Sequence, residues 1–147
     1  MNVSLSLVPH GVLYKFVGQM QYFLEVAAQR SRGRVAPDDI LRMFFTGQYQ
    51  LWVVLNERHI VMGFYASTIN VHPQKKMLCF QHCVLAPHVM KVVEADMEIK
   101  GMQFAKDNGC AGIEFMGRLG WRRYANTHGY DKQSVLYQKF FEGADHG

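Results

Sequence analysis

A glutamate at the end of a short apolar run is the clearest candidate for chemistry in this sequence. Glu114 alternates with Ile113 and Phe115, so an extended chain that buries the apolar pair turns the carboxylate to the opposite face. A partly buried carboxylate can act as a general base for an amine nucleophile. A surface ion pair with Arg118 or Arg122 is the commoner outcome for such a glutamate, and it stays open as the alternative.

Residues downstream of Glu114 extend this candidate site. Arg118, Trp121 and Arg122 follow the predicted strand directly, and ligands of α/β proteins collect where strands end. Trp121 could stack on a ligand, with a core anchor as its commoner role. His82, on an earlier predicted strand, is a second candidate base, with an ordinary strand histidine as the alternative. We expect the residues that follow the strand to converge on one mouth, which receives a small-molecule amine or a protein partner.

The elements that position these residues follow from hydrophobic periodicity. Pro37, followed by Asp38 and Asp39, marks a helix start, because proline fits the first turn and carboxylates favour the positive end of the helix dipole. The patterns predict, in order, a strand over 3–7, helices over 12–28 and 37–45, strands over 51–56, 59–70 and 76–85, a helix over 92–108, a strand over 112–116, a short basic helix and a last strand over 133–140. No repeat or linker interrupts this order, so residues 1–147 predict one domain.

Composition narrows the class of protein. A hydrophobic content of 49% with 13% aromatic residues argues against disorder. No run of about 18 apolar residues exists to span a membrane, and the N-terminus lacks a secretion signal, which predicts a cytoplasmic protein. The formal charge of +4 favours an anionic ligand or surface. Because the aromatic residues recur at core spacing, nucleic acid is an unlikely partner.

The sequence predicts structural roles, and not chemical ones, for the cysteines and for one cluster of arginines. Cys79 and Cys83 are expected on the same side of one strand, as buried reduced thiols and not as ligands of a metal. Arg30, Arg32 and Arg34 alternate in a loop, where we expect them to be solvated.

The order of the elements, together with several short motifs, resembles the GNAT superfamily of N-acetyltransferases. The motifs are Trp52-Val53-Val54 followed by Ile60-Val61-Met62-Gly63, the helix end Ala105-Lys106-Asp107-Asn108-Gly109-Cys110, and the glycine-aromatic turn Gly129-Tyr130. The resemblance implies an α/β (α+β) fold with a mixed central sheet, an antiparallel meander and helices on both faces. The strand over 112–116 is then expected beside that over 76–85, parallel near its start and splayed toward its end.

The resemblance also implies where acetyl-CoA would bind. In the family the pantetheine lies between the splayed strands and pairs with strand backbone, which corresponds here to Cys83, Val84 and Leu85. The pyrophosphate rests on the N-terminus of the following helix, where backbone N–H groups and the helix dipole favour an anion.

The family's phosphate loop has the pattern Arg/Gln-x-x-Gly-x-Gly/Ala, and this chain departs from it. Counting from Pro87, the matching positions are Met90, Val93 and Ala95, of which only Ala95 conforms. Met90 offers no donor, and Val93 is expected to place a branched side chain where phosphate approaches the backbone. Lys91 could restore a positive charge.

A second departure concerns the acid that protonates the leaving thiolate. Many family members use a tyrosine four residues before the glycine of a Gly-Phe turn, and the matching position here is Ala125. Tyr124 is the nearest hydroxyl, but a rotation of about 100° on a helix predicts that it faces elsewhere. The asparagine that often follows the fifth strand is replaced by Arg118.

The stretch from Gly109 to Tyr130 is similar to a narrower group, the GNAT-like proteins of tailed bacteriophages. Two functions follow from the resemblances. One is an acetyl-CoA-dependent N-acetyltransferase that acts on an amine. The other is a catalytically silent GNAT-fold phage protein with a structural or partner-binding role, placed in the host cytoplasm or in the virion with phage structural proteins as partners.

Overall fold

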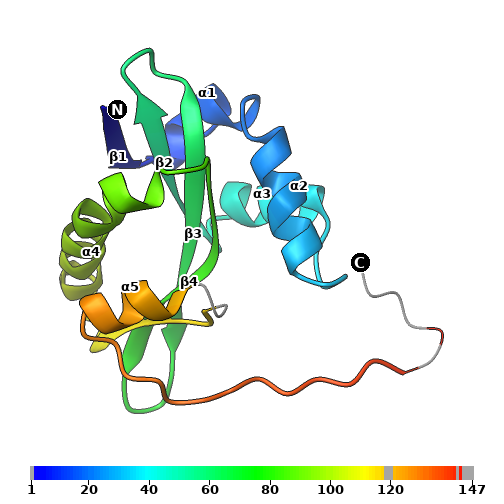
Figure 1. Ribbon diagram of the computed structural model, residues 1–147, viewed down its shortest axis with the longest axis vertical. Helices are drawn as coiled ribbons and strands as arrows, with labels where there is room; N and C mark the ends of the chain where they lie inside the picture. The colour runs from blue at the N-terminus through cyan, green and yellow to red at the C-terminus, as the bar shows by residue number, and fades with distance from the viewer. Residues whose placement is uncertain (1, 118–120, 142, 144–147) are drawn as a thin grey trace.

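A five-stranded mixed sheet forms the centre of the protein (Figure 1), and the computed structural model describes residues 2–117, 121–141 and 143. The strands follow their order along the chain: β1 (Val3–Leu7), β2 (Gln50–Asn56), β3 (Val61–Val71), β4 (Lys76–Leu85) and β5 (Gly112–Phe115). β1 to β4 pair antiparallel and β5 pairs parallel to β4, as predicted. β3 begins two residues later than expected because His59 adopts a φ of 61° in the preceding turn.

Helices cover both faces of the sheet, which confirms the predicted fold class. One side carries η1 (His10–Val12), α1 (Tyr14–Val17), α2 (Gln21–Arg30) and α3 (Pro37–Phe45), and the other side carries α4 (Met90–Asp107) and α5 (Arg122–Thr127) (Figure 1). α3 starts at Pro37, and the Asp39 carboxylate accepts a hydrogen bond from the N–H of Ala36 at 2.8 Å. In the described part of the chain no helix is both long and apolar enough to cross a membrane.

The single helix predicted over residues 12–28 is wrong, because the chain breaks there into η1, α1 and α2. α1 ends at Gly18, a residue that costs about 1 kcal/mol relative to alanine inside a helix. The side chain of Gln19 then accepts a hydrogen bond from the N–H of Val61 at 3.0 Å. This contact ties the break to the sheet, so tertiary structure overrides the helical periodicity.

The last predicted strand, over residues 133–140, is also wrong. Residues 131–141 form no helix or strand in the structure, and all but one of these side chains are exposed. Figure 1 shows this segment leaving α5 and running beneath the sheet toward the side of α2 and α3. A strand requires a neighbour that pairs with its backbone, and among the described residues this segment has none.

Two apolar cores lie on opposite faces of the sheet. The larger one packs α1, α2 and α3 against β2 and β3, and it includes Met20, Phe44 and Phe64. The second packs α4 against the other face around Trp52, whose indole N–H donates to Ser67 Oγ at 2.9 Å. Because neighbouring strand residues alternate between the two cores, the same strands support both helical layers.

A register shift in β4 corrects the prediction for its cysteines. The partners of Ala66 and Ser67 on β4 are His82 and Phe80, so one residue is extra on β4. Cys83 therefore packs into the core under α4, whereas Cys79 lies near Tyr49 on the other face. The expectation that both thiols share a side is wrong because the bulge reverses the alternation.

Candidate active site

β4 continues beyond the end of β5, and a gap opens beside it. The parallel pairing stops at Phe80 and Phe115, whereas β4 continues to Leu85. This confirms the predicted splay. A pocket of about 240 Å³ occupies the gap, lined by Arg30, Cys83, Leu85, Ala86, His88, Met90, Trp121, Arg123 and Tyr124.

The backbone of β4 faces this pocket at Cys83. The carbonyl of Cys83 accepts a hydrogen bond from Nη1 of Arg30, at the end of α2, at 3.0 Å. Since backbone groups alternate between the two edges of a strand, Leu85 presents its own N–H and C=O on the same edge. The predicted donor residues Cys83 and Leu85 thus line the pocket, while Val84 is buried in the core under α1 to α3.

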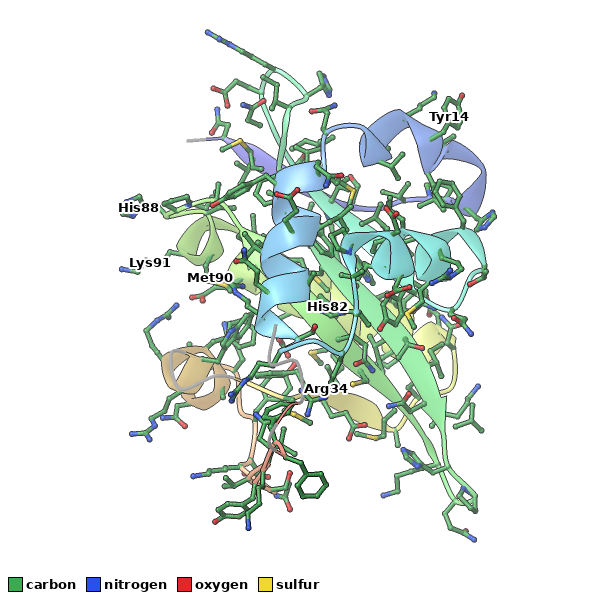
Figure 2. The ribbon with its side chains drawn as sticks, turned by 90° about the vertical axis from the view of Figure 1, so that its right-hand side faces the viewer. Tyr14, Arg34, His82, His88, Met90 and Lys91 are labelled. Carbon is green, nitrogen blue, oxygen red and sulfur yellow. The ribbon has the colours of Figure 1, made fainter. Side chains whose placement is uncertain are left out.

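The start of α4 forms the adjoining wall. Met90 is the first residue of the helix and lines the pocket, as does His88, which adopts a left-handed φ of 69°. Figure 2 shows the side chains of His88 and Lys91 extending outward at this end of α4. The N–H groups at the start of a helix and the helix dipole favour an anion, so this wall can receive one.

Val93 and Ala95 lie away from the position that the family pattern implied. Val93 is only 2% exposed and packs in the core with Trp52 and Tyr65. Its branched side chain points into the protein and does not stand in front of the helix start, which corrects the expected obstruction of phosphate. Ala95 is exposed on α4.

A half-buried carboxylate, that of Glu98, holds two tyrosine hydroxyls beside the pocket. Tyr124 donates to Oε2 of Glu98 at 2.6 Å, and Tyr130 donates to Oε1 of the same residue at 2.8 Å. Burial, then the hydrogen bond to Glu98 and its charge, raise the pKa of Tyr124 and Tyr130 well above the ordinary value for tyrosine. Tyr124 lines the pocket, so the expectation that it faces elsewhere is wrong.

An ion pair also holds α5 against α4. The two terminal guanidinium nitrogens of Arg123, Nη1 and Nη2, donate to the carboxylate of Glu94, at 3.1 and 2.7 Å. The hydrogen bond from Arg123 lowers the pKa of Glu94, and the same bond raises the pKa of Arg123. This two-point contact, together with the bonds to Glu98, fixes the helix that forms the far wall of the pocket.

His82 lies on the opposite face of β4 from the pocket. Its ring contacts the ring of Tyr49 at 5.8 Å, edge to face, and Figure 2 shows it beneath α2. Burial lowers the pKa of His82, which favours the neutral imidazole. A neutral imidazole can accept a proton, although β4 separates it from the pocket wall.

Glu114 is exposed and lies opposite Cys79 on β4. The δ-methyl carbon of Ile113 lies near Gly101 of α4, so the alternation turns Glu114 to the other face, as predicted. Burial, and secondly the charge of Glu114, raise the pKa of the Cys79 thiol to about 11. Within the described part of the chain Glu114 makes no ion pair, and Arg118 lies outside the described residues.

Trp121 combines the two roles that the sequence left open. Its ring packs against Phe115 and Tyr124, at centroid distances of 5.5 and 5.4 Å, and it also lines the pocket. Arg122 is exposed on α5.

The structure thus brings together Cys83, Leu85, Trp121 and Tyr124, but it leaves His82 and Glu114 on the other face. Sequence reasoning missed Arg30 and Glu98, whose partners lie 53, 26 and 32 residues away along the chain. A larger hollow of about 500 Å³ beside Tyr49 shares no lining residue with this pocket.

Comparison with solved structures finds the same fold in acetyltransferases. Glucosamine-6-phosphate N-acetyltransferase from Arabidopsis thaliana is 14% identical with a TM-score of 0.66, and the match covers 97% of this chain and 100% of that one. An acetyltransferase from Trypanosoma brucei is 9% identical with a TM-score of 0.68, covering 95% and 100%. An aminoglycoside acetyltransferase from an uncultured soil metagenomic sample, solved with sisomicin, is 11% identical with a TM-score of 0.70, covering 95% and 97%. The sequence matches no family model and no curated protein.

These likenesses agree with the strand order and with the gap between β4 and β5. The chain therefore has the fold of the GNAT N-acetyltransferases. At identities of 9–14% the likeness shows the fold alone.

Proposed function

We propose that this protein is an acetyl-CoA-dependent N-acetyltransferase that acts on an amine. The observation that carries the proposal is the extension of β4 beyond β5, which exposes strand backbone next to a helix N-terminus. An extended ligand with amide groups can pair with such an edge, and its phosphates can rest on the helix start. The aminoglycoside and glucosamine-6-phosphate N-acetyltransferases among the structural neighbours support the same reaction class.

The residues of the pocket fit the donor in part. The edge of Cys83 and Leu85 suits the amides of pantetheine, and the start of α4 with Lys91 suits its pyrophosphate. Arg30 spans the gap to the Cys83 carbonyl, and a pocket of about 240 Å³ is smaller than the sites that enclose most ligands. The donor therefore requires Arg30 to leave the Cys83 carbonyl.

Acetyl-CoA, when bound, supplies an acetyl thioester for attack by an amine. We assign the proton from the amine to solvent in the gap, because His82 and Glu114, the two candidate bases, lie on the opposite face of the sheet from the pocket. We assign protonation of the thiolate to Tyr124, whose side chain lines the pocket, and this step requires its hydroxyl to release the Glu98 carboxylate to which it donates. Arg118, Trp121 and Arg122 would then receive the acceptor amine.

Titration calorimetry with acetyl-CoA, followed by mass spectrometry of acetylated amines, tests the proposal. We expect binding by the native chain, and acetyl transfer to at least one member of an amine panel that includes aminoglycosides and hexosamine phosphates. Met90→Glu, at the start of α4, should weaken binding because a carboxylate there repels pyrophosphate. Met102→Glu, farther along the same helix and exposed, is the matched control and should bind normally.

Absence of acetyl-CoA binding by the native chain would contradict the proposal. Nothing in the comparisons favours the alternative of a silent phage protein that binds a partner. A folded chain that binds neither acetyl-CoA nor free CoA would be the result that revives it.

A further inference from the structure

Arg30 occupies the strand edge that the proposed donor needs. Its Nη1 donates to the carbonyl of Cys83 at 3.0 Å, and its side chain lines the same pocket as Cys83 and Leu85. The amides of pantetheine would approach this carbonyl, because an extended ligand pairs with the backbone of a strand edge. The guanidinium of Arg30 therefore stands where the donor has to lie.

The end of α2 holds the backbone of Arg30 in place, whereas its side chain is exposed. Leu24 and Ala27, on the inner face of α2, are buried in the core. Directly after the helix, Ser31 Oγ donates to the carbonyl of Ala28 at 2.6 Å. Exposed side chains change rotamer rapidly, so the guanidinium can move while α2 stays where it is.

The pocket gives the guanidinium of Arg30 a second position. Its lining includes Met90, the first residue of α4, where the pyrophosphate of the donor is expected, and His88 just before that helix. None of the described lining residues is acidic, and Arg123 in the same lining is already paired with Glu94. A phosphate at the start of α4 would thus share one small pocket with Arg30, with no carboxylate in the described lining to repel it.

Phosphate is a better acceptor for Arg30 than the carbonyl of Cys83. The carbonyl is neutral, whereas hydrogen bonds between ionised partners are shorter and roughly twice as strong. The planar guanidinium also matches two phosphate oxygens at once. Arg30 therefore gains by moving from the carbonyl to a phosphate, and a thioester without phosphate offers it no such gain.

We propose that Arg30 makes the donor site selective for thioesters that carry phosphate, because it leaves the Cys83 carbonyl when a phosphate at the start of α4 binds its guanidinium. This inference rests on the proposed function, since it concerns the acyl donor of that reaction. The pyrophosphate of acetyl-CoA draws Arg30 away and so uncovers the backbone of β4 for pantetheine. S-acetylpantetheine has the same thioester and amides without phosphate, so it has to compete with Arg30 for the strand edge.

Titration calorimetry of the full chain with acetyl-CoA and with S-acetylpantetheine tests this selectivity. Compared with the native protein, Arg30→Met should bind S-acetylpantetheine about 10-fold more tightly, because the strand edge is uncovered. The same variant should bind acetyl-CoA about 10-fold more weakly, because the contact with phosphate is lost. Arg34→Met is the matched control, since it removes the same charge from the loop after α2 but lies outside the pocket lining. It should leave both affinities within about twofold of the native values.

Opposite changes in the two affinities identify the exchange, since a variant that misfolds would lose both ligands. If Arg30→Met folds normally by circular dichroism and changes both affinities by the same factor, the inference is wrong and the proposed function stands. Tighter binding of both thioesters would mean that Arg30 only blocks the edge, which also overturns its transfer to phosphate. If neither the native chain nor Arg30→Met binds either thioester, the proposed function fails, and the selectivity fails with it.

Discussion

Tyr124 and Tyr130 share one carboxylate, but only one of them reaches the pocket. Both hydroxyls donate to Glu98, and Tyr124 alone also lines the gap beside β4. The raised pKa keeps each hydroxyl protonated at neutral pH. Both tyrosines can therefore stabilise the fold through Glu98, but only Tyr124 is placed to take part in the reaction.

Removal of the two hydroxyls should separate stability from activity. Tyr124→Phe and Tyr130→Phe should each lower the free energy of unfolding by about 1.5–3 kcal/mol, because each removes a hydrogen bond to a charged group. Only Tyr124→Phe should also lower kcat/KM, by about 100-fold or more, if it protonates the thiolate. Urea denaturation and acetyl-transfer rates measure the two quantities. Equal activity of the two variants would remove Tyr124 from the mechanism.

Val93 is a packing residue, which makes its replacement by glycine costly. Val93→Gly should lower the free energy of unfolding by about 2–4 kcal/mol, since it empties a core position and adds the helix penalty of glycine. Val92→Gly is the matched control, because Val92 is 48% exposed on the same turn, and it should cost about 0.5 kcal/mol or less. Thermal denaturation measures both. A more stable Val93→Gly protein, or one with higher affinity for acetyl-CoA, would argue against the buried placement.

His82 should make the fold sensitive to acid. Its pKa is lowered by burial in the folded state, so the unfolded chain binds the proton more readily. The stability that neutral His82 contributes is complete above the ordinary histidine pKa of about 6.5 and is lost as the pH falls below it. The fall in Tm between about pH 7.5 and 5.5 should be smaller for His82→Gln, which cannot titrate there. An identical fall in both proteins would show that His82 is not the group responsible.

β3 approaches β4 closely at Gly63. This close approach fixes the position of Leu85 on β4, which lines the pocket. Gly63 has a φ of 150° and pairs with Leu85, and a Cβ on it would lie 2.5 Å from the carbonyl oxygen of Val84. A side chain there would separate the two strands at the end of the sheet where the donor is expected. Gly63 thus allows β3 and β4 to pair and keeps the pocket edge of β4 in place.

Gly63→Ala should therefore disturb the sheet beyond the loss of one contact. We expect a fall of about 2–4 kcal/mol in the free energy of unfolding, from an unfavourable φ and from overpacking against backbone. Gly11→Ala, where an added Cβ meets nothing within 4 Å, is the control and should be nearly neutral. Chemical denaturation compares the two, and a Gly63→Ala protein as stable as its control would contradict the close approach.

Local patterns predicted most of the elements because their signals are short-range. The start of α3 at Pro37 and the meander are as these patterns predicted, and the parallel pairing of β5 with β4 is as the family resemblance implied. The helix over 12–28 failed at Gly18 because a bond from the distant Val61 stabilises the break. The strand over 133–140 failed because the composition of a segment shows what it can form and not which neighbour is available to pair with it.

The part of the site that lies at the strand ends was predictable, because the order of the elements decides where the strands end. The family resemblance placed Cys83 and Leu85 at the gap, the end of the fifth strand placed Trp121 near it, and all three line the pocket. Arg30 and Glu98 were not predictable, since their roles depend on contacts between elements far apart in the chain. The bulge in β4, which separates Cys79 from Cys83, likewise has no signal in one sequence.

The two cores share one sheet, so the molecule should unfold as a unit. Phe44→Ala in the core under α3 and Met97→Ala in the core under α4 should each cost about 2–5 kcal/mol. Each variant should still show a single urea transition, with coincident midpoints by far-UV and near-UV circular dichroism at one protein concentration. Two separated transitions in either variant would mean that the helical layers unfold independently.

The positions of the two tryptophans give the protein a pair of internal optical reporters. Trp52 is buried among Phe80 and Phe104 and bonded to Ser67, so its emission should be blue-shifted and should change only on unfolding. Trp121 borders the gap, so its emission should follow whatever enters there. In the Trp52→Phe variant the fluorescence of Trp121 should change on addition of acetyl-CoA while the protein stays folded. In the Trp121→Phe variant the fluorescence of Trp52 should not change on addition of acetyl-CoA. Occupancy of the gap can thus be titrated without a label and without knowledge of the acceptor.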